Sequence, residues 1–165
     1  MRSPPRSTAS APRYSIDAMD DDRAAIAALV YAYAERLDAG DLDGVADLFA
    51  HATLRSDRHD VVRRGRAAAL ALYREVVVLY DGLPCTKHVI TNLHIELAHD
   101  RRQATSLCAF TVLQARPELP LQAILAGRYC DRVVADGPAE WRFEDRLIRV
   151  DFAGELRWHN RRAVP

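Results

Sequence analysis

One stretch of the chain, Pro84 to Asp100, decides how the fold is interpreted, and it reads PCTKHVITNLHIELAHD. Its β-branched and apolar residues predict a strand over about residues 87–97. His88, Asn92 and His94 share one alternating register of that strand, although a strand in a sheet normally buries one face. The register that carries them therefore faces either water or a pocket.

Helices are predicted before this strand. Apolar residues from Ile26 to Leu37 recur at helical spacing and predict a first helix, which Asp20–Asp22 cap and Ala39–Gly40 ends. The elements expected next are a shorter helix from Asp41, a strand over residues 51–57 and a third helix over residues 65–84.

Three more strands are predicted after the strand at residues 87–97, at about residues 103–115, 121–134 and 140–152. The turn signals AHDRR, RPELP and DGPA precede them, and no helix separates them. This order disfavours a parallel doubly wound fold. It predicts an α+β fold in which a curved, mostly antiparallel sheet wraps three N-terminal helices.

The composition suits a single domain and excludes several functions. The 165 residues include 23 Lys and Arg against 23 Asp and Glu, and no strongly basic block is present. Nucleic acid is therefore not an expected partner. The sequence has no GxGxxG turn, no phosphate-binding loop and no metal-binding spacing of histidines and cysteines, which predicts a site without cofactor or metal.

The two ends of the chain differ from its middle. Residues 1–18 are rich in Pro, Ser and Arg, and they predict a disordered extension with neither a signal peptide nor a membrane span. The ordered domain is expected over residues 19–152 and a tail over residues 153–165. Three cysteines without a CxxC pair are typical of a reduced cytoplasmic protein.

Four segments together resemble the SnoaL-like branch of the nuclear transport factor 2-like superfamily. They are YAERLDAGDLDGVADLFAHATLRSD (33–57), TKHVITNLHIEL (86–97), GRYCDRVV (127–134) and WRFEDRLIRV (141–150). The resemblance covers about residues 20–152 and implies a cone-shaped α+β barrel with an apolar pocket. The superfamily includes scytalone dehydratase, bile acid dehydratases, polyketide cyclases, ketosteroid isomerases and proteins without catalysis.

The resemblance also implies a site. Scytalone dehydratase and the bile acid dehydratases pair a helix-end aspartate with a strand histidine, and Asp38 and His88 match these positions. Tyr33 matches a pocket tyrosine of the bile acid dehydratases. The expected substrate-binding residues are Asn92, Gln114, Tyr31, Tyr129 and Arg146, with Arg149 as the alternative to Arg146.

These residues suit proton transfer near neutral pH. Asp38 would fix the imidazole tautomer, His88 would move the proton, and Tyr33 would donate to a substrate carbonyl. The predicted function is a cofactor-independent lyase or isomerase, dehydratase- or cyclase-like, for a small apolar carbonyl compound. Scytalone itself is not expected, because Leu37 replaces a tyrosine and Gln114 falls near the second histidine of scytalone dehydratase.

Each residue also has a structural interpretation. Asp38 could satisfy backbone groups at a helix exit, Tyr33 could belong to the core, and His88 could be a surface or core histidine. The alternative function is a non-catalytic ligand-binding or assembly module of the same fold, like the small subunit of ring-hydroxylating dioxygenases. The two functions differ in whether Asp38 and His88 meet at a closed pocket.

A homodimer through the outer face of the sheet is expected as well. Apolar residues occupy both registers of the strands, as Ile90 and Ile95 or Ile124 and Leu125 illustrate, and a sheet that is apolar on both faces needs a second cover. Bulges that turn these residues inward would instead allow a monomer.

Overall fold

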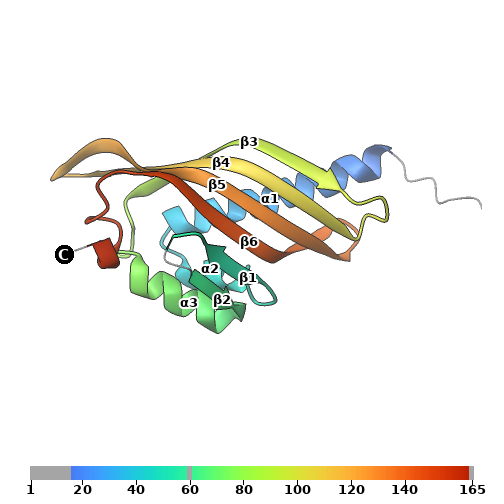
Figure 1. Ribbon diagram of the computed structural model, residues 1–165, viewed down its shortest axis with the longest axis horizontal. Coiled ribbons are helices and arrows are strands. Elements are labelled where there is room, and N and C mark those ends of the chain that lie inside the picture. The colour runs from blue at the N-terminus through green and yellow to red at the C-terminus, as the bar shows by residue number, and fades with distance from the viewer. Residues whose placement is uncertain (1–15, 59–60, 164–165) are drawn as a thin grey trace, which may run out of the picture.

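The computed structural model describes residues 16–58 and 61–163, which form one sheet with helices packed against it (Figure 1). The predicted α+β class is confirmed. Most of the predicted disordered extension, residues 1–15, lies outside the described residues. The elements in chain order are α1 (Ile16–Asp38), α2 (Leu42–Asp47), β1 (Thr53–Ser56), β2 (Val61–Arg64), α3 (Gly65–Val76), β3 (Thr86–Leu97), β4 (Gln103–Arg116), β5 (Leu119–Gly137), β6 (Glu140–Ala153) and η1 (Arg161–Ala163).

The six strands form a single open sheet in the order β2-β1-β6-β5-β4-β3. All neighbouring pairs are antiparallel except β1 and β6, which run parallel. β2 and β3 are the two edges, so the expected barrel is not closed. β2 was not predicted, because it is only four residues long and directly precedes α3.

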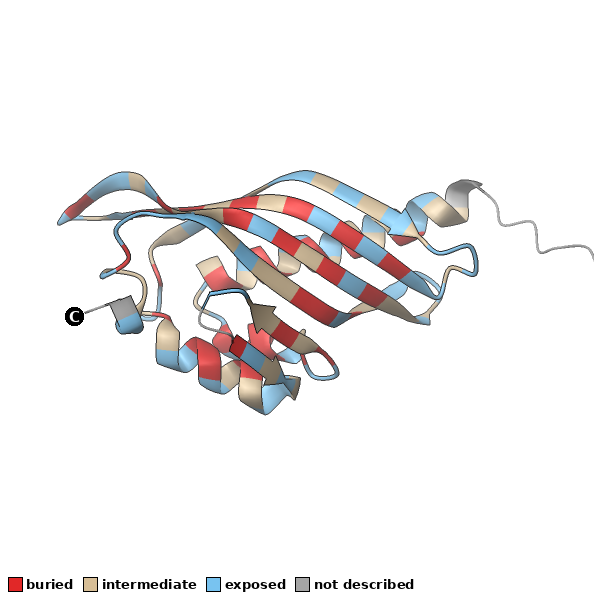
Figure 2. Cartoon of the chain, in the orientation of Figure 1, coloured by how far each residue is buried: buried red, intermediate tan, exposed pale blue. Residues whose placement is uncertain are grey.

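The long strands alternate buried and exposed side chains, as Figure 2 shows along β4 and β5. On β4, alternate residues from Ala104 to Gln114 are buried. Their partners in the core come from α1, α2 and α3, and α1 lies against β3 and β6. The buried face of the sheet therefore looks toward the helices.

A bulge in β3 changes the alternating register that was predicted for His88, Asn92 and His94. The pairing of β3 with β4 shifts between Thr91 and His94, and Asn92 has a positive φ of 53°. Before the bulge, His88 and Ile90 point inward; after it, Ile95 does. The predicted common register of His88, Asn92 and His94 is therefore wrong, because the extra residue moves Asn92 and His94 to the exposed side.

α1 ends as predicted, and its end brings Asp38 close to β3. Gly40 has a φ of 74°, the N–H of Asp41 donates to the carbonyl of Arg36, and a Cβ on Gly40 would lie 2.0 Å from the carbonyl oxygen of Gly82. Only glycine allows this approach. The loop that leads into β3 can thus pass directly beside the last turn of α1.

Two predicted boundaries of helices are wrong. α1 begins at Ile16, and Asp22 lies inside it as a buried residue that accepts hydrogen bonds from Arg101 and Trp141 instead of capping the helix. α3 ends at Val76, well before residue 84, because Val77 pairs with Asn160 in a β-bridge. The run of β-branched valines there favours extended backbone.

No helix among the described residues is long and apolar enough to cross a membrane.

Candidate active site

A cavity of about 160 Å³ opens between the buried face of the sheet, α1, α3 and the segment after β6. Most of its wall is apolar. The polar side chains that line it are Tyr33, Tyr73, Thr86, His88, Tyr129, His159 and Asn160. Two of the three residues predicted to be catalytic, Tyr33 and His88, therefore face the same space.

Asp38 and His88 are in direct contact. Oδ1 of Asp38 lies 2.6 Å from Nδ1 of His88, and the backbone N–H of His88 donates to Oδ2 at 2.7 Å. The hydroxyl of Thr86 donates to Oδ1 at 2.9 Å. The side chains of Asp38 and His88 are 10% and 6% exposed. A carboxylate on Nδ1 places the ring proton there and leaves the lone pair of Nε2 free to act as a base.

Asp38 itself is not part of the cavity wall. It lies in a shallow depression on the other side of His88, with Tyr31 and Lys87. Burial raises the pKa of Asp38, but the hydrogen bonds and positive charge of His88 and the hydroxyl of Thr86 lower it more, so this pKa lies below its ordinary value. Asp38 therefore stays ionised near neutral pH, and it is connected to the cavity through its contact with His88.

Three tyrosines converge deeper in the cavity, from α1, α3 and β5. The hydroxyls of Tyr33 and Tyr73 lie 2.9 Å apart, and the rings of Tyr33 and Tyr129 meet edge to face at 5.4 Å. Burial raises the pKa of all three, and the nearby charge of Arg146 offsets this only partly. They remain neutral at pH 7 and can donate hydrogen bonds. Tyr73 was not among the predicted site residues; it lies within the third predicted helix.

Arg146 points inward but lies behind the cavity wall. Its guanidinium sits 4.3 to 4.4 Å from the ring centres of Tyr33, Tyr129 and Phe143, and it makes two hydrogen bonds of 2.7 Å to Asp131. Both charged side chains are fully buried. The ion pair therefore supports the tyrosines from behind, whereas Arg149 is half exposed and faces Asp57.

Three of the other predicted substrate-binding residues do not line the cavity. Asn92 is exposed at the bulge of β3, and Tyr31 is 44% exposed in the depression that holds Asp38. Gln114 is buried, but its amide donates to the carbonyls of Pro84 and Trp158. Gln114 therefore braces the rim of the cavity.

The segment after β6, expected only as a tail, closes one side of the cavity. The hydroxyl of Tyr80 and the amide of Gln114 both donate to the carbonyl of Trp158, at 2.8 and 3.1 Å. Leu156 is buried, and His159 lines the cavity. The available sequence signal was the pair of apolar residues Leu156 and Trp158 within an otherwise polar segment.

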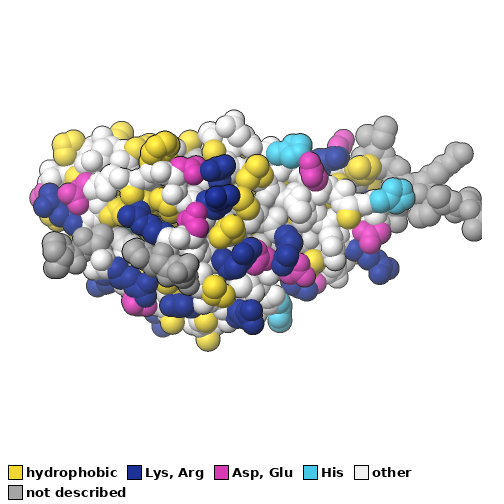
Figure 3. Space-filling model, viewed as in Figure 1, with side chains coloured by type: hydrophobic (Ala, Val, Ile, Leu, Met, Phe, Trp, Pro, Cys, Tyr) yellow, Lys and Arg dark blue, Asp and Glu magenta, His cyan; other side chains and the backbone are white. Residues whose placement is uncertain are grey.

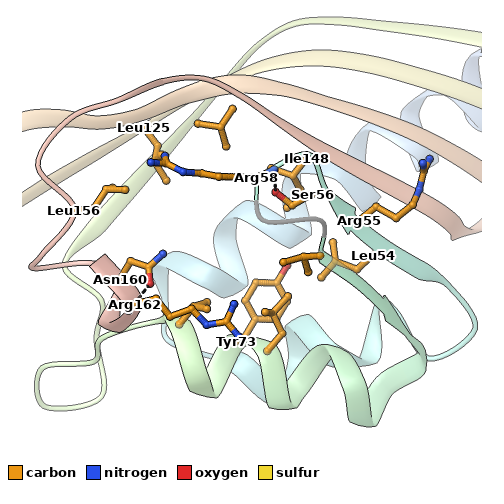
Figure 4. Close-up of a pocket in the computed structure, with 14 residues that line it drawn as sticks. Leu54, Arg55, Ser56, Arg58, Tyr73, Leu125, Ile148, Leu156, Asn160 and Arg162 are labelled. Atoms are coloured by element: carbon orange, nitrogen blue, oxygen red, sulfur yellow. Dashed lines mark hydrogen bonds between the residues drawn. The ribbon is translucent and has the colours of Figure 1, made fainter. Parts of the chain in front are cut away.

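A second cavity of about 160 Å³ adjoins the first (Figure 4). The two share the wall residues Tyr73, Val76, Leu125, Ile148, Val150 and Asn160. The second cavity is also mainly apolar, and Arg58 and Arg162 lie at its rim. A ligand held at His88 therefore has room to extend between the sheet and α3.

Among the described residues, no group of three or more His, Cys, Asp or Glu side chains is arranged to hold a metal ion.

Comparison with known proteins identifies relatives of this architecture. The model of the SnoaL-like domain matches residues 20–147. A solved structure of a Mycobacterium tuberculosis protein of unknown function is 25% identical, with a TM-score of 0.67 and coverage of 84% of this chain and 76% of that one. No curated protein matches the chain.

Two similar structures come from Novosphingobium aromaticivorans. One, provisionally assigned as a scytalone dehydratase, is 20% identical with a TM-score of 0.67, over 85% of this chain and 91% of that one. The other, provisionally assigned as the β subunit of an aromatic-ring-hydroxylating dioxygenase, is 18% identical with a TM-score of 0.65, over 82% and 93%. At these identities the likeness shows the fold.

Proposed function

The chain belongs to the SnoaL-like domain family, and we propose that it is a cofactor-independent lyase or isomerase that moves a proton on a small apolar carbonyl compound. The observation that carries this proposal is the 2.6 Å contact between Asp38 and His88, with His88 facing an apolar cavity. The similarity to a protein provisionally assigned as a scytalone dehydratase is compatible with it.

The proposed first step removes a proton from the carbon next to a substrate carbonyl. Nε2 of His88 takes the proton, and the electron pair of the C–H bond moves to form an enolate on the carbonyl oxygen. Asp38 stabilises the imidazolium that results, and a neutral hydroxyl of the Tyr33–Tyr73 pair can donate to the oxygen. Return of the proton from His88 to another carbon of a conjugated enolate gives isomerisation. Where the substrate carries a β-hydroxyl, the enolate electrons expel it, the proton from His88 passes to the leaving oxygen, and water is released.

The test follows deuterium exchange in 2-tetralone, a small apolar ketone with acidic C–H bonds, by NMR in D₂O. We expect the wild type to accelerate exchange, and His88→Gln to lower this rate by at least roughly 100-fold, since it removes the base. His94→Gln is the matched control, because His94 is an exposed histidine of the same strand. It should exchange at the wild-type rate.

Two results would contradict the proposal. One is exchange in His88→Gln at the wild-type rate. The other is a wild type that does not exceed the rate in buffer, which would favour the alternative of a non-catalytic binding or assembly module. The similarity to a protein provisionally assigned as a dioxygenase β subunit is what supports that alternative.

A further inference from the structure

His159 is the second histidine in the wall of the cavity that holds His88. Its Nδ1 is fully buried without a hydrogen-bond partner, and its Nε2 makes no hydrogen bond to any described residue. Since Nδ1 has no exposed surface, Nε2 is the polar atom with which this ring can face the cavity. An imidazole whose nitrogens are both unpaired costs free energy unless a ligand or water completes it.

The backbone around His159 is nevertheless fixed. The carbonyl of His159 accepts from the N–H of Val78 at 3.0 Å, and its own N–H donates to Leu156 at 2.9 Å. Asn160 pairs with Val77 as a β-bridge, and the carbonyl of Trp158 accepts from Tyr80 and Gln114. The ring is therefore held at the cavity wall by its backbone, while its polar atoms remain available.

The imidazole of His159 is neutral at physiological pH. The pKa of His159 is lowered to about 4, mainly by burial and also by the positive charge of His88, and the charge of Asp38 offsets only part of this. A buried N–H group without a partner is rarer in proteins than a buried acceptor without one. The favoured tautomer therefore carries its proton on Nε2 and leaves only a lone pair on the buried Nδ1. In this state His159 has one N–H to offer to the cavity.

We propose that His159 is a further catalytic residue, which donates the hydrogen bond from Nε2–H to the substrate oxygen that becomes negative when His88 takes the proton. His159 transfers no proton in this step; it stabilises the enolate oxygen. The inference rests on the proposed function and identifies the oxygen-binding part of the same site. One hydroxyl of the Tyr33–Tyr73 pair donates to the other, so this pair has a single O–H left for the same oxygen, and His159 adds a second donor.

The test uses binding of 4-nitrophenol, whose hydroxyl imitates an enol, against 4-nitrotoluene, which has the same shape without the hydroxyl. Affinities are measured by calorimetry, and the yellow absorption of bound 4-nitrophenolate shows whether the site favours the anion. We expect wild type to bind 4-nitrophenol more tightly than 4-nitrotoluene. His159→Phe should lower the affinity for 4-nitrophenol alone by roughly tenfold, which corresponds to about one hydrogen bond.

Two further variants separate hydrogen bonding from packing. His159→Gln places an amide N–H near the position of Nε2 and should restore binding to within about threefold of wild type. His159→Asn is shorter, reaches only the position of Nδ1 and should behave like His159→Phe. Thermal unfolding of each variant checks that the segment after β6 remains folded.

The proposal is overturned if His159→Phe lowers the affinity for both ligands equally, if His159→Gln fails to restore the affinity for 4-nitrophenol, or if wild type does not bind 4-nitrophenol more tightly than 4-nitrotoluene. These results do not depend on turnover. If binding depends on His159 while 2-tetralone exchanges at the buffer rate, the oxygen-binding role stands and the proposed proton transfer fails. If exchange requires His88 but the affinity of neither ligand depends on His159, the proposed proton transfer stands and the oxygen-binding role of His159 fails.

Discussion

Asp38 accepts three hydrogen bonds, and these bonds make its ionised form a source of stability for the fold. The pKa of Asp38 is lower in the folded protein than its ordinary value, because the bonds and charge of His88 outweigh burial. A carboxyl with a depressed folded pKa stabilises the fold fully above its unfolded pKa. The contribution is lost as pH falls through the folded value.

Asp38→Ala should therefore lower the free energy of unfolding by about 1–3 kcal/mol at pH 7, because it leaves the hydroxyl of Thr86 and the two N–H groups of His88 without their acceptor. The difference from wild type should shrink below about pH 4, the ordinary pKa of an aspartate. Urea unfolding between pH 7 and pH 3 measures it. Thr86→Val removes only one of the three bonds and should cost less. A cost that stays constant or grows on acidification would contradict this account.

At the scale of single residues, the family resemblance of the sequence predicted the contact between Asp38 and His88 but not its surroundings. A helix-ending Ala39–Gly40 and a histidine at a strand start are local signals. The buried pair of Asp131 and Arg146 depends on two strands lying side by side, and the isolated sequence of each strand carries no sign of this contact.

At the scale of elements, the bulge of β3 sets which side chains meet the core. Asn92 occupies a left-handed conformation there, which asparagine and glycine tolerate and β-branched residues do not. Asn92→Val should destabilise the protein by about 1–2 kcal/mol, whereas Asn92→Gly should be neutral to within about 1 kcal/mol.

Thr91→Val is the matched control for this prediction, because Thr91 is an exposed neighbour without a positive φ. It should leave the midpoint of urea unfolding within error of wild type. Equal midpoints for Asn92→Val and Asn92→Gly would show that the bulge imposes no backbone requirement.

The four long strands could be predicted because turn residues separate them and apolar residues recur within them. The bulge could not, because one additional residue in a strand changes neither its composition nor its length noticeably. The segment after β6 escaped prediction for a different reason. Its order comes from contacts of Trp158 and His159 with residues 44 to 81 positions earlier in the chain, and local sequence does not record them.

At the scale of the whole molecule, the helices lie behind and below the long strands, and no described helix crosses the front of β3–β6 in Figure 1. Because of the bulge, both Ile90 and Ile95 face the core, and Ile124 is buried, so these three residues need no second cover. Val89 and Leu107 remain 39% and 46% exposed. In the same view, apolar side chains on this face lie among arginines and carboxylates (Figure 3).

We propose that two copies of the chain pack through this face. Leu107, Cys130 and Leu147 line a hollow of about 390 Å³, which also contains the ion pair of Arg55 and Asp145. A hollow that combines apolar side chains with charges of both signs can match a second copy of itself across a twofold axis. The absence of net charge on the chain removes a general repulsion between copies.

Light scattering after gel filtration at micromolar concentration should therefore give a mass near twice the 18.5 kDa of one chain. Leu107→Glu should shift the mass to that of one chain, because it would bury a carboxylate among the apolar side chains of the proposed interface. Val62→Glu is the control, since Val62 is 48% exposed on β2 at the other edge of the sheet. A wild-type mass near 18.5 kDa would exclude the dimer, and dissociation by Val62→Glu but not by Leu107→Glu would place the interface elsewhere.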